Sequence, residues 1–353
     1  MSVLFLNGYL CPAAHAEVKI IEADSAYIMG DNDSKIDARR IATQEAKRKA
    51  LEQAGTFVES LTQVRDFQLT KDEVKSYTAG ILETEIVSEQ MGGTTEHPEI
   101  SIKTRCKIDT DVLLAQINRY RESEVLKEQL NATAREKDSL RHERDALVKQ
   151  LAAQTNKTKA EATRKKLDKV LIKEESNDEA NKVWMNIGPQ LLEADKNGRE
   201  PDKAELDNAS MILRKTIETN PENVRSRIML AALYQREGNF DAAEQELRTA
   251  VKTNPSNPIL HVRLGDLFNE QGRYKDAIRE YHFVERMKPR SPLIFFSMGM
   301  TYKAIMKCGL SVQYLNRFLK NPQSNNYPKK KETALQSVEE CGGNRPGRVK
   351  HGR

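Results

Sequence analysis

Histidine, cysteine, serine and the acidic residues could all do chemistry in this chain, and their spacing decides whether they do. The histidines are His15, His97, His142, His261, His282 and His351. None of them forms an HExxH pair, and no serine or cysteine lies in a nucleophile motif such as GxSxG. The sequence also contains no phosphate-binding loop and no dinucleotide fingerprint. We therefore predict that the protein is not an enzyme and that it has no catalytic residue, no metal site and no cofactor.

The cysteines offer one further chemistry, a disulfide. None of the four lies in a CxxC pair. Cys308 and Cys341 are 33 residues apart, almost one period of the repeat described next, so they can face each other from equivalent turns. A disulfide requires Cα atoms within about 7 Å, which is closer than neighbouring helices usually approach. The sequence therefore leaves open whether this pair is bonded.

A period of 34 residues marks the C-terminal half of the chain. Pro221, Pro255 and Pro289 are each 34 apart. At the same offset, small residues fall on small ones and large on large, as in Leu230-Ala231 with Leu264-Gly265, Tyr234 with Phe268, Gly238 with Gly272, Ala243 with Ala277 and Leu247 with Tyr281. A third copy from Pro292 keeps Met298-Gly299, Tyr302 and Phe318. This register resembles the tetratricopeptide repeat, whose helix pairs stack into a solenoid.

The period also sets the borders of this region. A degenerate first unit runs from Asn177 to Pro221, and "YPKKKETALQSVEECGG" is typical of the capping helix that a terminal repeat needs. We predict a solenoid over residues 177–341 and a basic, disordered tail over 342–353. Loose attraction of that tail to anionic envelope phosphates is a lesser alternative.

The resemblance implies that the first helix of each pair lines a concave groove. The predicted partner-binding residues are Arg225, Ile228, Gln235, Arg236, Ile259, Val262, Asn269, Phe296, Met300 and Lys303, and the same face also carries Ala232, Asp266, Glu270 and Leu293. The first row is basic, the second mixed and the third apolar. Such a groove suits a peptide or protein with apolar anchors and charges. The Lys and Asn arrangement with which some members of the family hold a chaperone's carboxylate does not occur in this register.

A heptad pattern precedes the repeats. Leucines and a few polar residues recur in a 4-3 seam, at Leu126, Leu130, Thr133, Lys137, Leu140, Arg144, Leu147 and Leu151. A helix with such a stripe needs a partner, because it cannot bury the stripe alone. We predict a coiled-coil stalk and linker over residues 111–175, with "AAQTNKTKAEATRKK" as a flexible joint. The stalk would make the protein a homo-oligomer. A solvated spacer helix is the alternative.

The N-terminal segment, residues 17–110, predicts a small α+β domain. "EVKIIEADSAYIMG" favours a β-hairpin, and Asp33 then caps a helix that Gly55 ends. Ile36, Ile41, Ala46, Ala50, Leu51 and Ala54 would form its narrow apolar face. A second helix follows in "LTKDEVKSYTAGIL", and residues 100–108 alternate as a half-buried strand with Cys106 inward. The helix, "GTFV" after it, and Tyr77 with Gly80 resemble the N-terminal domain of flagellar assembly protein T and related periplasmic lipoproteins.

Residues 1–16 have features of an export signal. Val3–Leu10 is apolar, Pro12 follows, and Ala14-His15-Ala16 offers small residues for cleavage. A basic start is missing, which fits a truncated signal or a true start further upstream. The chain contains no apolar stretch long enough to span a membrane. Its net charge of +5 is dispersed, which does not indicate nucleic acid. We therefore expect a periplasmic protein.

Together these patterns predict a mostly α protein: a small α+β domain, a long coiled-coil helix and a tetratricopeptide solenoid. The function that fits is a non-enzymatic scaffold that holds an envelope protein or peptide in its groove. A flagellar or secretion-system accessory factor is the alternative suggested by the N-terminal resemblance. A cell-wall-processing enzyme targeted by its repeats is an alternative of another class.

Overall fold

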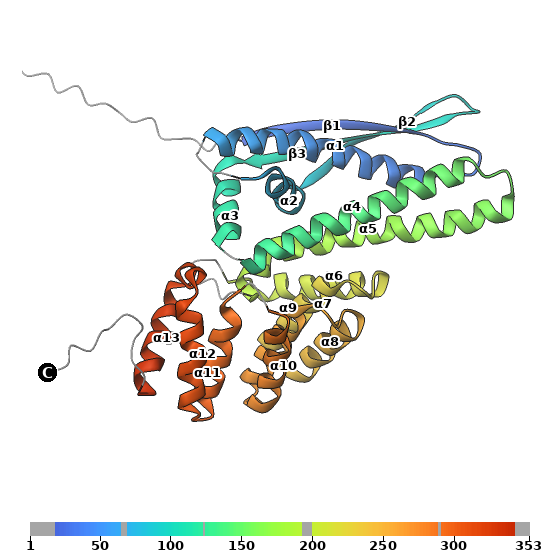
Figure 1. The fold of residues 1–353 in the computed structure, drawn as a ribbon. Helices are drawn as coiled ribbons and strands as arrows, with labels where there is room; N and C mark the ends of the chain where they lie inside the picture. Colours follow the sequence, from blue (N-terminus) through green and yellow to red (C-terminus); the bar gives the residue numbers. More distant parts are fainter. Residues whose placement is uncertain (1–17, 65–68, 123, 193–199, 289–290, 343–353) are drawn as a thin grey trace, which may run out of the picture. The chain divides into compact units, whose positions relative to one another are not determined.

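A computed structural model describes residues 18–64, 69–122, 124–192, 200–288 and 291–342. The chain divides into two compact units. The first contains the residues up to Ser123 and Leu130–Leu167, and the second contains Glu124–Gln129 and the residues from Asp168 onward. The described residues are mostly helical, with one small sheet near the N-terminus and stacked helix pairs toward the C-terminus (Figure 1). The predicted fold class is therefore confirmed.

The sheet of the first unit has three antiparallel strands, β1 (Val18–Ile28), β2 (Thr84–Gly93) and β3 (Pro98–Asp109), in the order β1-β3-β2. The predicted alternation of β3 is confirmed: Ile100, Ile102, Thr104 and Cys106 are buried, and the residues that alternate with them are more exposed. Burial raises the pKa of the Cys106 thiol to about 11. This cysteine is therefore a small core residue and not a reactive thiol.

The predicted β-hairpin was wrong. Residues 18–28 form one strand that pairs with β3 along its whole length, from Val18 opposite Asp109 to Ile28 opposite Glu99. The residues around Asp24 look like a polar turn in the sequence, but Asp24 and Ala26 lie on the exposed face of a straight strand while Ala23 and Ser25 are buried. Polar alternation and a polar turn look alike over so short a stretch.

Helix α1 (Lys35–Val64) covers one face of the sheet with a stripe of small residues. Ala38, Ala42, Ala46, Ala50 and Ala54 recur every four residues and are all buried. Alanine at this spacing lets the helix approach the strands closely. The predicted face was right for Ile41, Ala46, Ala50 and Ala54, but Leu51 is half-buried and Ile36 is 64% exposed.

Two predicted ends of α1 also differ. Ser34, not Asp33, caps the helix, since its Oγ accepts from Asp37 N at 3.1 Å while Asp33 accepts from Gly30 N and Tyr27 Oη. Gly55 does not end the helix but lies within it. A Cβ at Gly55 would lie at an ordinary contact distance of 3.5 Å from Thr78 of α2 (Lys71–Ile81), which packs beside α1 at this point.

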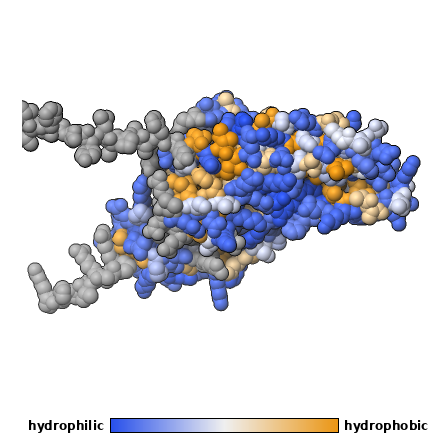
Figure 2. Space-filling view, turned by 90° about the horizontal axis from the view of Figure 1, so that it is seen from above, coloured by the Kyte–Doolittle hydropathy of each residue, from blue (hydrophilic) through white to orange (hydrophobic). Residues whose placement is uncertain are grey.

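Some apolar side chains of the sheet stay exposed. In Figure 2, hydrophobic patches interrupt a largely hydrophilic face. The exposed apolar residues of the strands are Val18, Ile20, Ile28, Ile86, Val87 and Met91. Between them, Glu22 pairs with Lys103 and Arg105 across the outer face of β1 and β3. These ion pairs lower the pKa of Glu22.

After α3 (Thr110–Glu122), the heptad segment forms α4 (Glu124–Ala152). The leucines Leu130, Leu140, Leu147 and Leu151 are buried, as are Thr133 and Arg144. Lys137 is half-buried, and the side chain of Leu126 lies outside the described residues. Arg144 lies 3.9 Å from Glu45 of α1, and Asn32 donates to the Gln154 carbonyl at 3.0 Å. The seam is therefore buried inside a single chain.

The expected flexible joint is replaced by a tight reversal. Only residues 153–156 separate α4 from α5 (Lys157–Leu192), which begins with Asn156 accepting from Lys159 N at 3.1 Å. The heptad ends here because the chain turns, not because the helix frays. Ala160, Thr163 and Leu167 are buried on the first turns of α5. These turns belong to the same unit as the end of α4.

The helices of the second unit follow in pairs. Their bounds are α6 (Lys203–Thr219), α7 (Val224–Arg236), α8 (Phe240–Thr253), α9 (Pro258–Glu270), α10 (Tyr274–Arg286), α11 (Leu293–Ala304), α12 (Cys308–Lys320) and α13 (Pro328–Glu340), with a short 3₁₀ turn at Pro322–Asn326. The end of α5 packs on α6, where Thr216 Oγ1 donates to the Ser176 carbonyl at 3.1 Å. This pair occupies the place of the predicted degenerate first unit.

The 34-residue register has the packing role that its residue types indicate. A Cβ at Gly265 would lie 2.5 Å from the Tyr281 ring, and one at Gly299 would lie 2.6 Å from Leu315. Small residues at this position therefore let the two helices of a pair cross. Ala243, Leu247 and Ala250 are almost fully buried in one continuous core with their equivalents in the second repeat, Ala277, Tyr281 and Val284. Pro221 and Pro255 are described residues, whereas Pro289 lies outside them.

Candidate functional site

The first helices of the pairs, α7, α9 and α11, carry the predicted binding residues (Figure 1). We call the surface that these helices share the inner face. Near its N-terminal end it is hollowed by a pocket of about 250 Å³. The apolar lining residues are Leu191, Ile228, Ala232 and Leu247, and the polar ones are Gln190, Gln235, Arg236, Arg263, Asp266 and Glu270. Alanine at position 232 makes room that its counterpart Met300 would fill.

Hydrogen bonds order the rim of this pocket. Gln235 Nε2 donates to Glu270 Oε2 at 3.0 Å, linking α7 to α9. Arg236 reaches out of the pocket to Glu200, with Nη2 and Oε2 3.2 Å apart. Both bonds lie on the exposed rim of the pocket.

Asp266 is a half-buried acid of the pocket. Its Oδ1 accepts a hydrogen bond from Tyr281 Oη at 2.7 Å. Burial raises the pKa of Asp266, although Arg263 and Tyr281 act in the opposite direction. Burial and the nearby carboxylate raise the pKa of Tyr281 as well, so its hydroxyl stays a donor. The pocket thus holds a carboxylate in an environment that does not fully compensate its charge.

The structure brings three of the ten predicted residues to the pocket: Ile228, Gln235 and Arg236. Ala232, Asp266 and Glu270, which the same pattern placed on this face, join them. Arg225 lies elsewhere, because its Nη2 donates to Asn181 at 2.7 Å and its guanidinium covers the Trp184 ring at 5.5 Å. It fastens α7 to α5.

The middle row of predicted residues mainly joins neighbouring repeats. Ile259 and Val262 are half-buried and pack against the continuous core. Asn269 Oδ1 accepts from Thr301 Oγ1 at 3.1 Å, which links α9 to α11. These contacts occupy the side chains that the sequence pattern assigned to a ligand.

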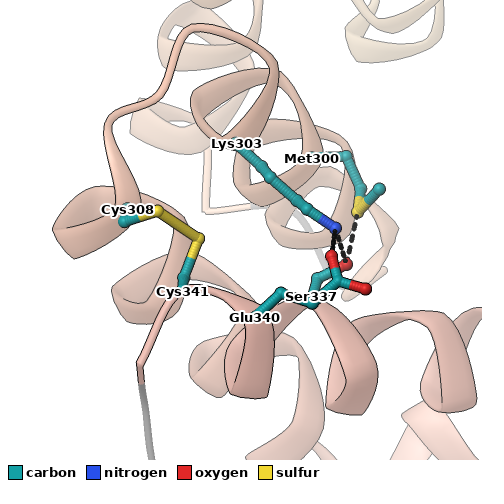
Figure 3. Close-up of a disulfide and its surroundings, with 6 residues drawn as sticks. All are labelled: Met300, Lys303, Cys308, Ser337, Glu340 and Cys341. Atoms are coloured by element: carbon teal, nitrogen blue, oxygen red, sulfur yellow. Dashed lines mark hydrogen bonds and ion pairs between the residues drawn. A yellow bond between two sulfur atoms is a disulfide. The ribbon is translucent and has the colours of Figure 1, made fainter.

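The last row is covered by the capping helix. Phe296 and Met300 pack against the cluster that contains Ala334 and Val338 of α13. Lys303 Nζ donates to Ser337 Oγ at 3.0 Å and pairs with Glu340, and Ser337 Oγ lies 3.6 Å from the Met300 sulfur (Figure 3). The apolar anchors predicted here are half-buried and pack on α13, which takes the place that a further repeat would fill, and their role in binding stays a prediction. Leu293 packs against the same cluster.

A disulfide holds α13 in this place. Cys308 begins α12 and Cys341 directly follows α13, with their Cα atoms 5.0 Å apart and the two sulfurs bonded (Figure 3). The bond joins the two ends of helices at a corner, where the chains can approach more closely than helix axes do. That geometry answers the question that the spacing of 33 residues left open.

Four lining residues escaped the sequence prediction: Gln190, Leu191, Leu247 and Arg263. Leu247 belongs to a second helix, and its register position indicated core packing only. Gln190 and Leu191 come from the end of α5, where the repeat pattern is degenerate. Arg263 adjoins the predicted Val262 and could have been found by widening the inward face by one residue.

Residues 228–282 match the tetratricopeptide repeat model. This segment runs from α7 to α10 and includes most of the lining of the pocket. No curated protein matches the chain in sequence. The match covers the two repeats whose register is strongest in the sequence.

Solved structures with which the chain aligns include further repeat proteins. MamA aligns with 16% identity over 46% of this chain and 81% of its own, with a TM-score of 0.36. PilF from Pseudomonas aeruginosa aligns with 19% identity over 49% and 79%, with a TM-score of 0.35. YrrB, described as a tetratricopeptide protein with an unusual peptide-binding site, aligns with 15% identity over 39% and 77%, with a TM-score of 0.31. At these scores the alignments carry no argument about function.

The remaining chemistry-bearing residues form no further centre in the described part of the chain. No group of three or more His, Cys, Asp or Glu residues there could hold a metal ion. His261 and His282 are tied to Glu280 and Glu285, at 2.7 and 2.9 Å. None of the described helices is long and apolar enough to cross a membrane.

Proposed function

We propose that this protein is a non-enzymatic scaffold that binds a peptide or protein segment on the inner face, at the pocket between α7 and α9. The pocket carries the proposal, because it joins an apolar floor to a rim of polar groups that lies mostly within the matched repeats. Peptide-binding surfaces combine apolar anchoring with a few oriented polar contacts in this way. The ligand is held at this end because α13 covers the inner face at the other end.

We also propose that the protein works in the bacterial periplasm. Two observations support this location: the apolar run with small residues at the start of the chain, and the Cys308–Cys341 disulfide. Disulfides persist in oxidising compartments and are rare in the cytosol. Residues 1–17, which contain the export features, lie outside the described residues.

Oligomerisation through α4 is not part of this proposal. The seam leucines Leu130, Leu140, Leu147 and Leu151 are already buried in one chain, so the stripe does not require a second copy. The N-terminal resemblance concerns the first unit alone, and no contact of the inner face depends on it.

Site-specific photo-crosslinking tests the binding proposal. A photoreactive phenylalanine analogue replaces Gln235 in the pocket and, as the matched control, Gln245 on the exposed side of α8. We expect one discrete adduct from position 235 in intact cells and none from 245. Equal labelling at both positions, or none at 235, would contradict the proposal.

A fusion of the full chain to alkaline phosphatase tests the location. This reporter is active only where its own disulfides form, which is outside the cytoplasm. The full chain should give an active fusion, and a version that starts at Glu17 should not. Equal activity of the two fusions would refute export through residues 1–16.

A further inference from the structure

Two acidic residues form one wall of the pocket. Asp266 and Glu270 are four residues apart on α9, so they lie on one face of the helix. Opposite them, Ile228 and Ala232 of α7 and Leu247 of α8 give an apolar floor. A pocket of about 250 Å³ is smaller than the roughly 300–1,000 Å³ that small-molecule sites usually measure. It is therefore sized for a single long side chain.

The Asp266 carboxylate is fixed in place and undersupplied with donors. Tyr281 Oη holds Oδ1 at 2.7 Å, and the other oxygen accepts no hydrogen bond from the described residues. Burial raises the pKa of Asp266 even with Arg263 beside it. A desolvated carboxylate of this kind is stabilised by a further cation.

The charges around the pocket leave one acid without a counter-ion. Arg236 is paired outward with Glu200, and both Arg263 and Lys330 act on Asp266. Glu270 accepts a hydrogen bond from Gln235, which is neutral, and forms no ion pair among the described residues. Glu270 is therefore the acid of the pocket that has no ion-pair partner among the described residues.

From this geometry we propose that the pocket binds a lysine or arginine side chain of the bound segment. The alkyl stem lies over Ile228, Ala232 and Leu247, and the cationic head meets Asp266 and Glu270. Long basic side chains bury their stems on apolar surface while the charge meets a polar group, as this pocket requires. The inference rests on the proposed function and specifies the chemistry that the inner face selects.

Selection from a phage-displayed library of random peptides tests the inference. The full chain is the bait, and the enriched peptides are then measured by calorimetry against three variants. The acidic wall is removed by Asp266→Asn with Glu270→Gln, which keeps the shapes and lets Tyr281 donate as before. Asp241→Asn is the matched control, since Asp241 is an exposed acid on α8. Ile228→Glu disrupts the floor.

We expect enriched peptides to share a lysine or arginine. The double variant should bind them at least tenfold more weakly, and the Asp241 control should bind them unchanged. Replacing the shared lysine in the peptide by norleucine should cost the wild-type protein the same factor and the double variant almost nothing. This peptide-side change does not depend on whether a protein variant folds well.

The outcomes separate this inference from the proposed function. Peptides that lose binding with Ile228→Glu but share no basic residue would overturn the basic-side-chain pocket and leave peptide binding in place. The basic-side-chain pocket is also overturned if the double variant and the norleucine peptide both bind as the originals do. Peptide binding on the inner face itself would be overturned if no peptides are enriched, or if the enriched peptides bind the Ile228→Glu variant as tightly as the wild type.

Discussion

The first two repeats and the third share one register but meet different needs. In the first two, Arg227 and His261 occupy equivalent positions, and each bonds the carbonyl of the preceding proline and a glutamate of its own second helix. In the third, the equivalent residues are aromatic, Phe295 and Tyr314, and Arg317 covers both rings at 4.0 and 5.3 Å. Polar ties join repeats that continue, whereas an aromatic cluster closes the repeat that ends.

The same contrast holds on the inner face. Ala232 and Asp266 leave a pocket between the first two repeats, while Met300, their counterpart, contacts α13. The internal repeats keep a hollow on the inner face, whereas the terminal repeat fills this surface by packing on α13. The register therefore fixes which side chains face inward, and the neighbour along the solenoid decides whether they remain available.

The largest effect should come from removing the disulfide. Cys308→Ser with Cys341→Ser opens a loop of 33 residues, which the chain-entropy model values at about 3–4 kcal/mol. We expect faster hydrogen exchange of the amides of α13 and α11, measured by mass spectrometry. Exchange in α7 to α9 should stay unchanged, and so should binding at the pocket. Equally faster exchange throughout the second unit would show that the disulfide stabilises the first two repeats as much as the last repeat and α13.

The polar ties of the first two repeats give the next largest effect. Arg227 Nη1 is 2.6 Å from Glu246, and both side chains are mostly buried. Arg227→Ala leaves that glutamate without its cation and should lower the free energy of unfolding by about 2–3 kcal/mol, measured by urea denaturation. His261→Ala should act in the same direction. His261→Arg should keep the stability of the wild type, because the arginine at the equivalent position 227 supplies both of the required donors. The control, Arg279→Ala, removes an exposed pair and should change little.

These contrasts show what the sequence could predict. Ala243, Gly265 and Tyr281 recur because every helix pair must cross in the same way, so their roles follow from the period alone. The roles of Phe296 and Lys303 depend on what covers α11, the first helix of the last repeat. The 34-residue period gives no information on this, because the repeats stop there. The α4 heptad has a related ambiguity, because Leu140 and Leu147 need burial equally from this chain or from a second copy.

The pocket was predictable in part for the same reason. Ile228, Gln235 and Arg236 followed from the inward register. The end of α5, with Leu191, did not, because its repeat pattern has decayed. Asp266 was placed on the right face, but its burial and its bond to Tyr281 depend on how closely α9 and α10 pack.

A smaller stabilising effect should come from Met306. It stands where Gly238 and Gly272 have φ of 75° and 73°, has φ of 59° itself and is 85% exposed. Side chains disfavour this left-handed backbone, so Met306→Gly should raise the free energy of unfolding by about 1 kcal/mol. The reverse change, Gly272→Met, should lower it by a similar amount, since a Cβ there meets no atom within 4 Å and only the backbone matters. Denaturation of both variants measures the pair, and two changes of the same sign would contradict this explanation.

The smallest expected effect is a difference between Glu285, in the last repeats, and Asp266, at the pocket, in how each contributes to the free energy of unfolding as the pH falls. Burial alone would raise the pKa of Glu285, but Arg317 and His282 bind its carboxylate and lower it overall. Tyr314 Oη also donates to it, at 3.3 Å. A lowered pKa means that Glu285 stabilises the fold above its unfolded pKa, and this contribution is lost as the pH falls through the folded pKa. Asp266 has the opposite sign, because its raised pKa makes the charged form a cost near neutral pH that disappears on protonation.

Two isosteric variants separate these signs. At pH 7, Glu285→Gln should be less stable than the wild type and Asp266→Asn more stable, as measured by urea denaturation at steps from pH 7 to pH 4. Both differences should shrink as the pH falls, and that of Asp266 should shrink first, because its carboxyl takes up a proton at higher pH. The Glu285 carboxylate would then stabilise the fold beside the last repeat, whereas the Asp266 carboxylate would destabilise it at the pocket. This pattern is expected if Asp266 serves a ligand and not the fold. If Asp266→Asn were less stable than the wild type at pH 7, the acid would be serving the fold, and the contrast between the two ends would fail at its most specific point.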